Sequence, residues 1–243
     1  MFIEIYKDVE EMGRTEALRI ARLIQGKKDP LLCVPAGQSF ICVFKELIEM
    51  YKKGAVDFSD VKFVGLDEWC GYDAYESSAG WILDTTFFNF INVRRENMRL
   101  FDPNPKDPEG ECRAIEQYIE DNGGIDYLAL GVGMNGHVGL NEPGADFSLG
   151  AHVNELAQKT LEVSDKYFKD GIPPLKKGMT LGFKNFFEAK EIVVALNGVH
   201  KAPIAERFMQ TPVTEAYPVT NMKTCPRTRI LLDQAAASQI YKL

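Results

Sequence analysis

The sequence has few of the residues that metal centres, disulfide frameworks and membrane segments require. Its 243 residues include three histidines and five cysteines, and no two cysteines form a C-x-x-C pair. Such an odd, scattered set fits a reducing compartment and predicts neither disulfides nor a structural zinc site. No run of 18 apolar residues is present, and the first residues lack the apolar stretch of a signal peptide. We therefore expect a cytoplasmic protein with no membrane partner.

Positive charge is also scarce. Lys and Arg number 28 against 35 Asp and Glu, which gives a net charge of −7. A broad nucleic-acid interface is excluded, because phosphate backbones require a basic surface. A small phosphorylated ligand is still compatible, since backbone N–H groups and one or two lysines can bind a phosphate locally. Neither a G-x-S-x-G elbow nor a P-loop is present, so serine hydrolysis and nucleotide hydrolysis have no motif support.

What is present is a regular alternation of strand and helix patterns with no internal repeat or linker. Strand patterns occur at 2–6, 31–34, 61–66, 127–130, 192–196 and 230–232. Helix patterns occur at 8–26, 40–51 and 111–120, from about 201, and in a short Ala-rich segment after 232. This order predicts an α/β fold, with a single domain spanning 1–243 and a doubly wound, mainly parallel sheet that has helices on both faces.

Four short segments follow the expected strands and carry most of the informative polar residues. They are 35–39, 67–68, 131–142 and 197–201. Ligands of open α/β sheets bind where strands end at their carboxyl edge. The four segments therefore predict one shared site before any family resemblance is considered.

The segment 131–142 holds the most informative titratable pair. His137 follows three glycines in six positions, and Glu142 lies five residues further on. A carboxylate beside an imidazole can fix its tautomer and prepare it for proton transfer. The glycine spacing differs from the dinucleotide fingerprint, so a nucleotide cofactor is not expected. Locally, a histidine with a structural hydrogen bond is the commoner interpretation.

Other candidates carry similar alternatives. Asp67 and Glu68 could face the ligand as bases or could cap a turn or helix. Ser39 could bind a phosphate at a helix N-terminus or serve as an ordinary N-cap. Lys166 and Lys201 could pair with a phosphate, although most lysines are solvated surface charges.

One long stretch identifies a family resemblance. Residues 130–144 read LGVGMNGHVGLNEPG and closely resemble the signature of the glucosamine-6-phosphate deaminases. Residues 66–69, LDEW, resemble the family's second motif, and residues 34–39, VPAGQS, resemble its phosphate loop. The similarity continues through 178–182 and 197–201 and covers nearly the whole chain.

The resemblance implies a reaction and a role for each matching residue. An amino-hexose 6-phosphate and water would give a ketohexose 6-phosphate and ammonia, without a cofactor or metal. Asp67 would move a proton between C2 and C1, His137 would open the sugar ring, Glu142 would orient His137, and Asn135 would polarise or orient without titrating. Substrate contacts would come from Ala36, Gly37, Gln38, Ser39, Glu68, Gly136, Lys166 and Lys201. Assemblies are common in the family, which allows a homo-oligomer.

Two departures and two alternatives follow from the same comparison. Lys166 stands where arginine is usual, so the charge is kept without the bidentate fork. The stretch 76–81 lacks the tyrosine that many members have in the lid over the sugar. The motif combination looks closest to a galactosamine-6-phosphate branch, so either epimer could be the substrate. The alternatives are a 6-phosphogluconolactonase, which typically lacks the residue at Glu142, and a non-catalytic sugar-phosphate sensor.

Overall fold

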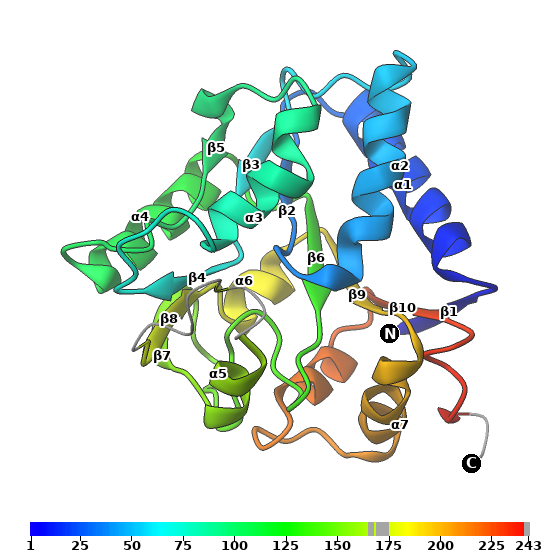
Figure 1. Ribbon diagram of the computed structural model, residues 1–243, viewed down its shortest axis with the longest axis vertical. Coiled ribbons are helices and arrows are strands. Elements are labelled where there is room, and N and C mark those ends of the chain that lie inside the picture. The colour runs from blue at the N-terminus through cyan, green and yellow to red at the C-terminus, as the bar shows by residue number, and fades with distance from the viewer. Residues whose placement is uncertain (165–167, 169–174, 241–243) are drawn as a thin grey trace.

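The computed structural model describes residues 1–164, 168 and 175–240. Seven parallel strands form the central sheet in the order β1-β10-β9-β6-β2-β3-β5 (Figure 1). Their bounds are β1 Phe2–Tyr6, β2 Leu31–Cys33, β3 Lys62–Val64, β5 Met98–Arg99, β6 Tyr127–Gly131, β9 Glu191–Leu196 and β10 Thr228–Asp233. All neighbouring pairs in this sheet are parallel, which confirms the predicted doubly wound architecture.

Both faces of the sheet are buried under helices. On one face pack α1 (Val9–Gly26), α2 (Ile41–Lys52) and α3 (Ala79–Thr86), and on the other pack α4 (Pro108–Asp121), α6 (Phe183–Glu188) and α7 (Ala202–Gln210). Strand β6 shows why its sequence is apolar throughout. Tyr127 and Ala129 join the first core, while Leu128 and Leu130 join the second, as expected for a parallel strand covered on both sides.

The order of the strands places a switch point between β2 and β6. From β2 the chain moves outward through β3 to β5, and from β6 it moves the other way through β9 to β10. Loops that follow β2 and β6 therefore diverge from adjacent strands, which opens a crevice at their carboxyl ends.

A second, three-stranded antiparallel sheet was not predicted. It consists of β4 (Asp67–Cys70), β8 (Lys177–Thr180) and β7 (His152–Glu155) in that order. The chain leaves the parallel sheet at Gly65, where an added Cβ would lie 3.1 Å from the Phe101 backbone nitrogen. The predicted strand at 61–66 is therefore shorter, and Asp67 and Glu68 begin a new strand instead of forming a loop.

The Ala-rich segment that follows β10 was predicted as a helix, and this is wrong. Residues 234–239 form successive turns. The Asp233 carboxylate accepts hydrogen bonds from the backbone N–H groups of both Ala236 and Gly198, which fixes this turn beside the end of β9. So short a segment cannot offset the cost of nucleating a helix.

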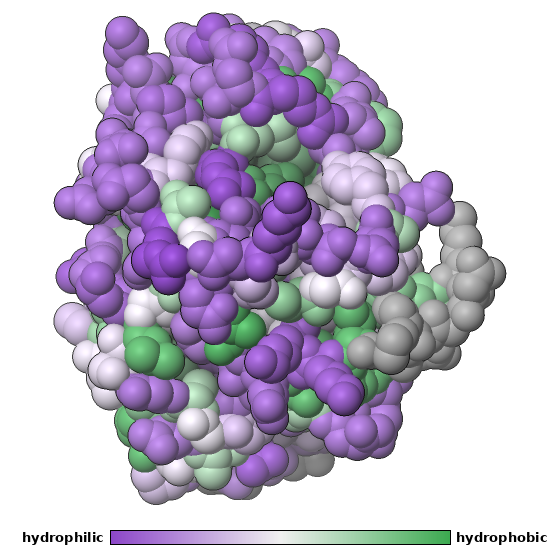
Figure 2. Space-filling model, turned by 90° about the vertical axis from the view of Figure 1, so that its left-hand side faces the viewer, coloured by the Kyte–Doolittle hydropathy of each residue, from purple (hydrophilic) through white to green (hydrophobic). Residues whose placement is uncertain are grey.

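The surface agrees with the acidic, polar composition. Figure 2 shows a largely hydrophilic face interrupted by small separate apolar areas. Within the described part of the chain, no helix combines the length and apolar character that crossing a bilayer requires.

Candidate active site

The turn after β2 forms one wall of the site. Its 3₁₀ segment, Gln38–Phe40, begins directly after Gly37 and leads into α2. The Asn197 side chain, at the end of β9, donates a hydrogen bond of 2.7 Å to the Ser39 carbonyl oxygen. Gly131 lies opposite, and a Cβ added there would be 3.5 Å from Ser39 Oγ. Loops after β2, β6 and β9 are therefore in contact, as the strand order requires.

Lys201 lies beside this turn. It ends the 3₁₀ segment Val199–Lys201 that precedes α7, and its Nζ donates a hydrogen bond of 2.6 Å to the Val132 carbonyl oxygen. Gly198 has a φ of 81°, a conformation that favours glycine, and the Asp233 carboxylate accepts its N–H. The lysine is thus directed toward the loop after β6.

Asp67 opens β4 and pairs with Thr180 of β8 across the antiparallel ladder. Burial raises the pKa of its carboxyl to about 6, and the nearby charge of His137 acts in the opposite direction. The carboxylate is therefore mostly ionised at neutral pH, yet it is a stronger base than an ordinary aspartate. Gly139 lies beside this pair, with a φ of 57°, and an added Cβ there would lie only 2.6 Å from Thr180 Oγ1.

His137 and Glu142 form the expected pair. His137 Nδ1 lies 3.4 Å from Glu142 Oε2, and the same oxygen accepts a hydrogen bond of 2.8 Å from Asn135 Nδ2. Asn135 Oδ1 in turn accepts from the His137 backbone N–H at 3.2 Å. Burial acts to raise the pKa of Glu142, but its contacts with His137, Thr160 and Asn135 outweigh burial and lower it. The carboxylate is held ionised, which suits the orientation of an imidazole.

Two glycines explain why this loop is so rich in them. The His137 ring lies directly over Gly133, where an added Cβ would overlap the ring atoms. At Gly136, with φ 88°, an added Cβ would overlap the Tyr217 ring. These positions shape the loop and set the imidazole against its backbone.

Glu68 is buried, and its carboxylate faces the first turn of α3. Its Oε1 accepts hydrogen bonds of 2.9 Å from the backbone N–H groups of Trp69 and Ala79, and its Oε2 accepts from Gly80 at 3.3 Å. Burial raises the pKa of this carboxyl to about 8, against the effect of these three donors. Glu68 therefore anchors the N-terminus of α3 beside the site, and its predicted substrate contact stays a prediction.

These elements enclose a cavity of about 660 Å³. Among the predicted residues, those that line it are Ala36, Gly37, Gln38, Ser39, Asp67, Glu68, His137 and Lys201. Asn135 and Glu142 lie behind His137, in hydrogen-bond contact with one another. Gly136 packs against Tyr217, and Lys166 lies outside the described residues.

Several lining residues were missed from the sequence. They include Trp69, Ile82, Thr160, Val163, Asn197 and His200. Thr160 and Val163 lie on α5 (Gln158–Ser164), and Ile82 lies on α3. Neither helix carries a motif that indicates chemistry. The segment 197–201 had pointed to the region of Asn197 and His200 without distinguishing the two residues.

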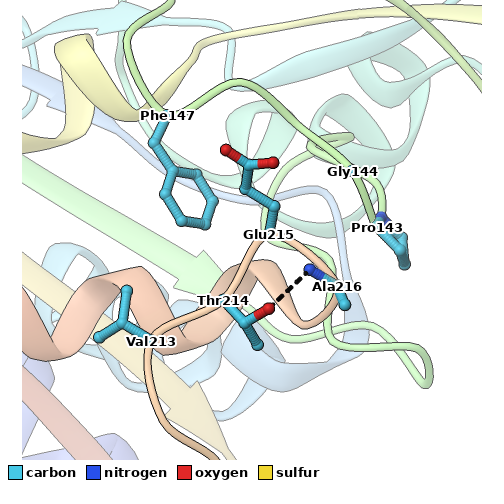
Figure 3. A pocket seen from close by; sticks show the side chains of 7 residues that line it. All are labelled: Pro143, Gly144, Phe147, Val213, Thr214, Glu215 and Ala216. Atoms are coloured by element: carbon cyan, nitrogen blue, oxygen red, sulfur yellow. Dashed lines mark hydrogen bonds between the residues drawn. The ribbon is translucent and has the colours of Figure 1, made fainter.

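A second hollow of about 700 Å³ lies next to the Glu142 loop but has a different character (Figure 3). It is lined by Pro143, Gly144, Phe147, Val213, Thr214, Glu215 and Ala216. Among the described residues that line it, Glu215 is the single titratable side chain, and no imidazole or lysine accompanies it. The side chains suited to proton transfer, Asp67 and His137, therefore line the first cavity.

Comparisons with known proteins agree with this geometry. The family model for glucosamine-6-phosphate isomerases/6-phosphogluconolactonase matches residues 9–230. The chain belongs to this family. It is 34% identical to a glucosamine-6-phosphate deaminase of Thermoanaerobacter pseudethanolicus over 241 residues, which is 99% of this chain and 95% of that protein. It is also 34% identical to the deaminase of Clostridium perfringens over 98% of both proteins.

Among solved structures, a deaminase is more similar to this chain than a 6-phosphogluconolactonase is. A monomeric glucosamine-6-phosphate deaminase superposes with a TM-score of 0.92 and 28% identity, over 98% of this chain and all of that one. The 6-phosphogluconolactonase of Leishmania guyanensis reaches 0.74 at 16% identity, over 98% of both chains, which shows the shared fold alone. For residues 1–164, 168 and 175–240, no group of three or more His, Cys, Asp and Glu is arranged to hold a metal ion.

Proposed function

We propose that the protein converts an amino-hexose 6-phosphate and water into a ketohexose 6-phosphate and ammonia. One observation carries the proposal. Asp67 and His137, which has Glu142 behind it, share one cavity with the Gly37–Ser39 turn and Lys201. A general base, an oriented imidazole and an anion-binding turn are the three parts that an isomerising deaminase needs.

The first step is ring opening. His137 transfers a proton between the C1 hydroxyl and the ring oxygen, so that the C1–ring oxygen bond breaks and an open-chain aldehyde forms. Glu142 holds the imidazole and stabilises its protonated form during this transfer. Asn135, which cannot titrate, keeps the Glu142 carboxylate in place through its own hydrogen bond.

The second step is the proton transfer that Asp67 performs. Its carboxylate removes the proton from C2, which is acidified by the neighbouring carbonyl, and returns a proton to C1 through an enolamine. Water then adds to the resulting C2 imine, and ammonia leaves. A base with a pKa of about 6 combines ionisation at neutral pH with useful proton affinity.

The phosphate fixes the substrate at a distance from the reacting carbons. We place it on the backbone N–H groups of the Gly37–Ser39 turn and on Lys201, whose three N–H donors allow it to keep its bond to Val132. Binding energy from this remote group orients C1 and C2 toward the base.

The proposal is tested by measuring ammonia and ketohexose 6-phosphate from glucosamine 6-phosphate and galactosamine 6-phosphate in parallel. We expect turnover of one or both, and the ratio of the two kcat/KM values identifies the preferred epimer. The 6-phosphogluconolactone serves as the control substrate. Lactone hydrolysis without ammonia from either amino sugar would assign the protein to the other activity of its family.

The acid limb of the pH profile gives a second prediction. Asp67 must be deprotonated to act as the base, and its pKa is raised to about 6. We therefore expect kcat/KM to fall as the pH decreases through about 6, instead of through the range near 4 where an ordinary aspartate titrates. Initial rates from pH 4.5 to 8 measure this. A profile that stays level down to pH 5 would remove Asp67 from the role of base.

Lys201→Met tests the phosphate site. Loss of one charge-assisted hydrogen bond should raise KM by roughly 10- to 100-fold. The effect on kcat should be smaller, because the lysine is remote from the reacting carbons. Lys52→Met, at a solvent-exposed lysine near the end of α2, is the matched control and should leave both constants unchanged. Equal KM values for the two variants would place the phosphate elsewhere.

A further inference from the structure

A side chain from outside the motif loop reaches the imidazole of the proton-transfer pair. Thr160 lies on α5, is 4% exposed and lines the cavity. Its Oγ1 is 3.2 Å from His137 Nδ1, across 23 residues of sequence. Neither the function proposed above nor the motif pattern assigns this threonine a role.

The hydrogen-bond requirements of its neighbours limit what the hydroxyl can do. Glu142 Oε2 accepts from Asn135 and lies 3.4 Å from His137 Nδ1. Glu142 Oε1 is buried and has no hydrogen-bond partner among the described residues. A buried ionised carboxylate requires donors to both oxygens. The Thr160 hydroxyl has one hydrogen to donate and lone pairs to accept with. It can therefore accept from the imidazole while its hydrogen is directed toward the Glu142 carboxylate, whose pKa it helps to lower.

We propose that Thr160 is a positioning residue of the His137–Glu142 pair, whose hydroxyl accepts from His137 Nδ1–H and donates to the Glu142 carboxylate. This inference rests on the proposed function, because it assigns a task within the same proton transfer. With its hydrogen held at Nδ1, the imidazole presents Nε2 as the proton acceptor. A neutral ring of the other tautomer would present a donor there and could not take a proton from the substrate.

The position of α5 gives this contact a further consequence. Val163, three residues after Thr160, also lines the cavity, so the helix presents both side chains to the same space. Leu161 packs against the cluster that contains Leu140, a residue of the loop between His137 and Glu142. The helix therefore packs against the loop that carries His137. A sugar that contacts Val163 would contact the same helix that orients the His137 ring.

The charged and polar groups around the pair come from three elements. The Asp67 carboxylate of β4 interacts electrostatically with His137, while Asn135 and Glu142 belong to the loop after β6. Thr160 is the contribution of α5, and its hydroxyl is one of the groups that lower the pKa of Glu142. Removing the hydroxyl should let the Glu142 pKa rise, while the Asp67 carboxylate stays in place.

The test compares Thr160→Val, which keeps the shape and removes the hydroxyl, with Thr160→Ser, which keeps the hydroxyl. We expect Val to lower kcat about tenfold, as for one hydrogen bond lost in the reacting geometry, with KM within twofold. Its acid limb should stay near pH 6, where Asp67 titrates, because Glu142 starts from a lowered pKa. Ser should retain most of kcat. Equal kcat values for the two variants would overturn the proposal.

A second measurement does not depend on turnover. The chain has three histidines, so two-bond proton–nitrogen NMR spectra can be assigned with His137→Gln as the reference. We expect one Nδ1–H tautomer at His137 in the wild type and in Thr160→Ser, and a mixture of tautomers in Thr160→Val. An unchanged nitrogen signature in Thr160→Val would refute the positioning role. Absence of ammonia release by the wild type would instead refute the proposed function. The NMR comparison would still decide whether Thr160 positions His137.

Discussion

Asp67→Asn should lower kcat by roughly 10²- to 10⁴-fold, the range found when a general base is removed. Asparagine keeps the shape of the side chain but cannot accept the C2 proton. Substrate affinity should change little, because the phosphate contacts lie on another loop and on Lys201. Calorimetric titration with the amino-sugar phosphate at low temperature, together with steady-state rates, separates the two effects.

Stability distinguishes this expected loss from misfolding. Burial raises the pKa of Asp67 to about 6, so above that pH the folded protein holds a charge whose burial opposes folding. Below about pH 6 the carboxyl takes up a proton and this unfavourable contribution diminishes. The asparagine variant lacks the charge, and its Tm at pH 8 should equal or exceed that of the wild type. Asp60→Asn, at an aspartate that is 65% exposed, is the control and should keep full activity. Near-normal turnover by Asp67→Asn would mean that another group removes the proton.

Gly133→Ala should lower kcat by about 100-fold with the fold intact, since an error of about 1 Å in placing a reacting group has that effect. The His137 ring lies directly over Gly133, and the added methyl group would occupy the space of its ring atoms. The backbone at Gly133 is not in the left-handed region, so alanine can adopt it without strain. The ring must then move, which disturbs its contacts with Glu142 and Thr160.

Gly26→Ala is the matched control for this variant. It ends α1, and an added Cβ there would have no atom within 4 Å. It should leave kcat unchanged and raise Tm slightly, as alanine does at a helical position. Circular dichroism and Tm should show that Gly133→Ala is folded. A wild-type kcat in Gly133→Ala would show that catalysis does not require the His137 ring to lie in its present position over Gly133.

The parallel sheet and the motif loop could be predicted because their signals are local. Apolar runs at 31–34 and 127–130 mark strands that are buried on both faces, and the polar residues that follow them end at one edge of the sheet. The start of α1 is local in the same way, because the Asp8 side chain caps the helix by accepting from the Glu11 N–H. These features depend on residues within a few positions of one another.

The parts that were missed depend on contacts between distant residues. Strand β4 exists because Asp67–Cys70 pairs with β8, more than 100 residues later. Glu68 was predicted to contact substrate, and its engagement with the first turn of α3 becomes visible only once that helix is placed. Thr160 had no motif at all, because its neighbour His137 belongs to a different segment. Tertiary packing, which local patterns do not encode, selected each of these positions.

The most direct test of the central claim follows ammonia and ketohexose 6-phosphate side by side in a single time course, for the wild type and for Asp67→Asn. The account predicts that the wild type forms one ammonia for each ketohexose 6-phosphate. In the variant, the rates of formation of both products should fall by the same factor. Ketose formation without ammonia, or ammonia release that survives the loss of Asp67, would contradict it.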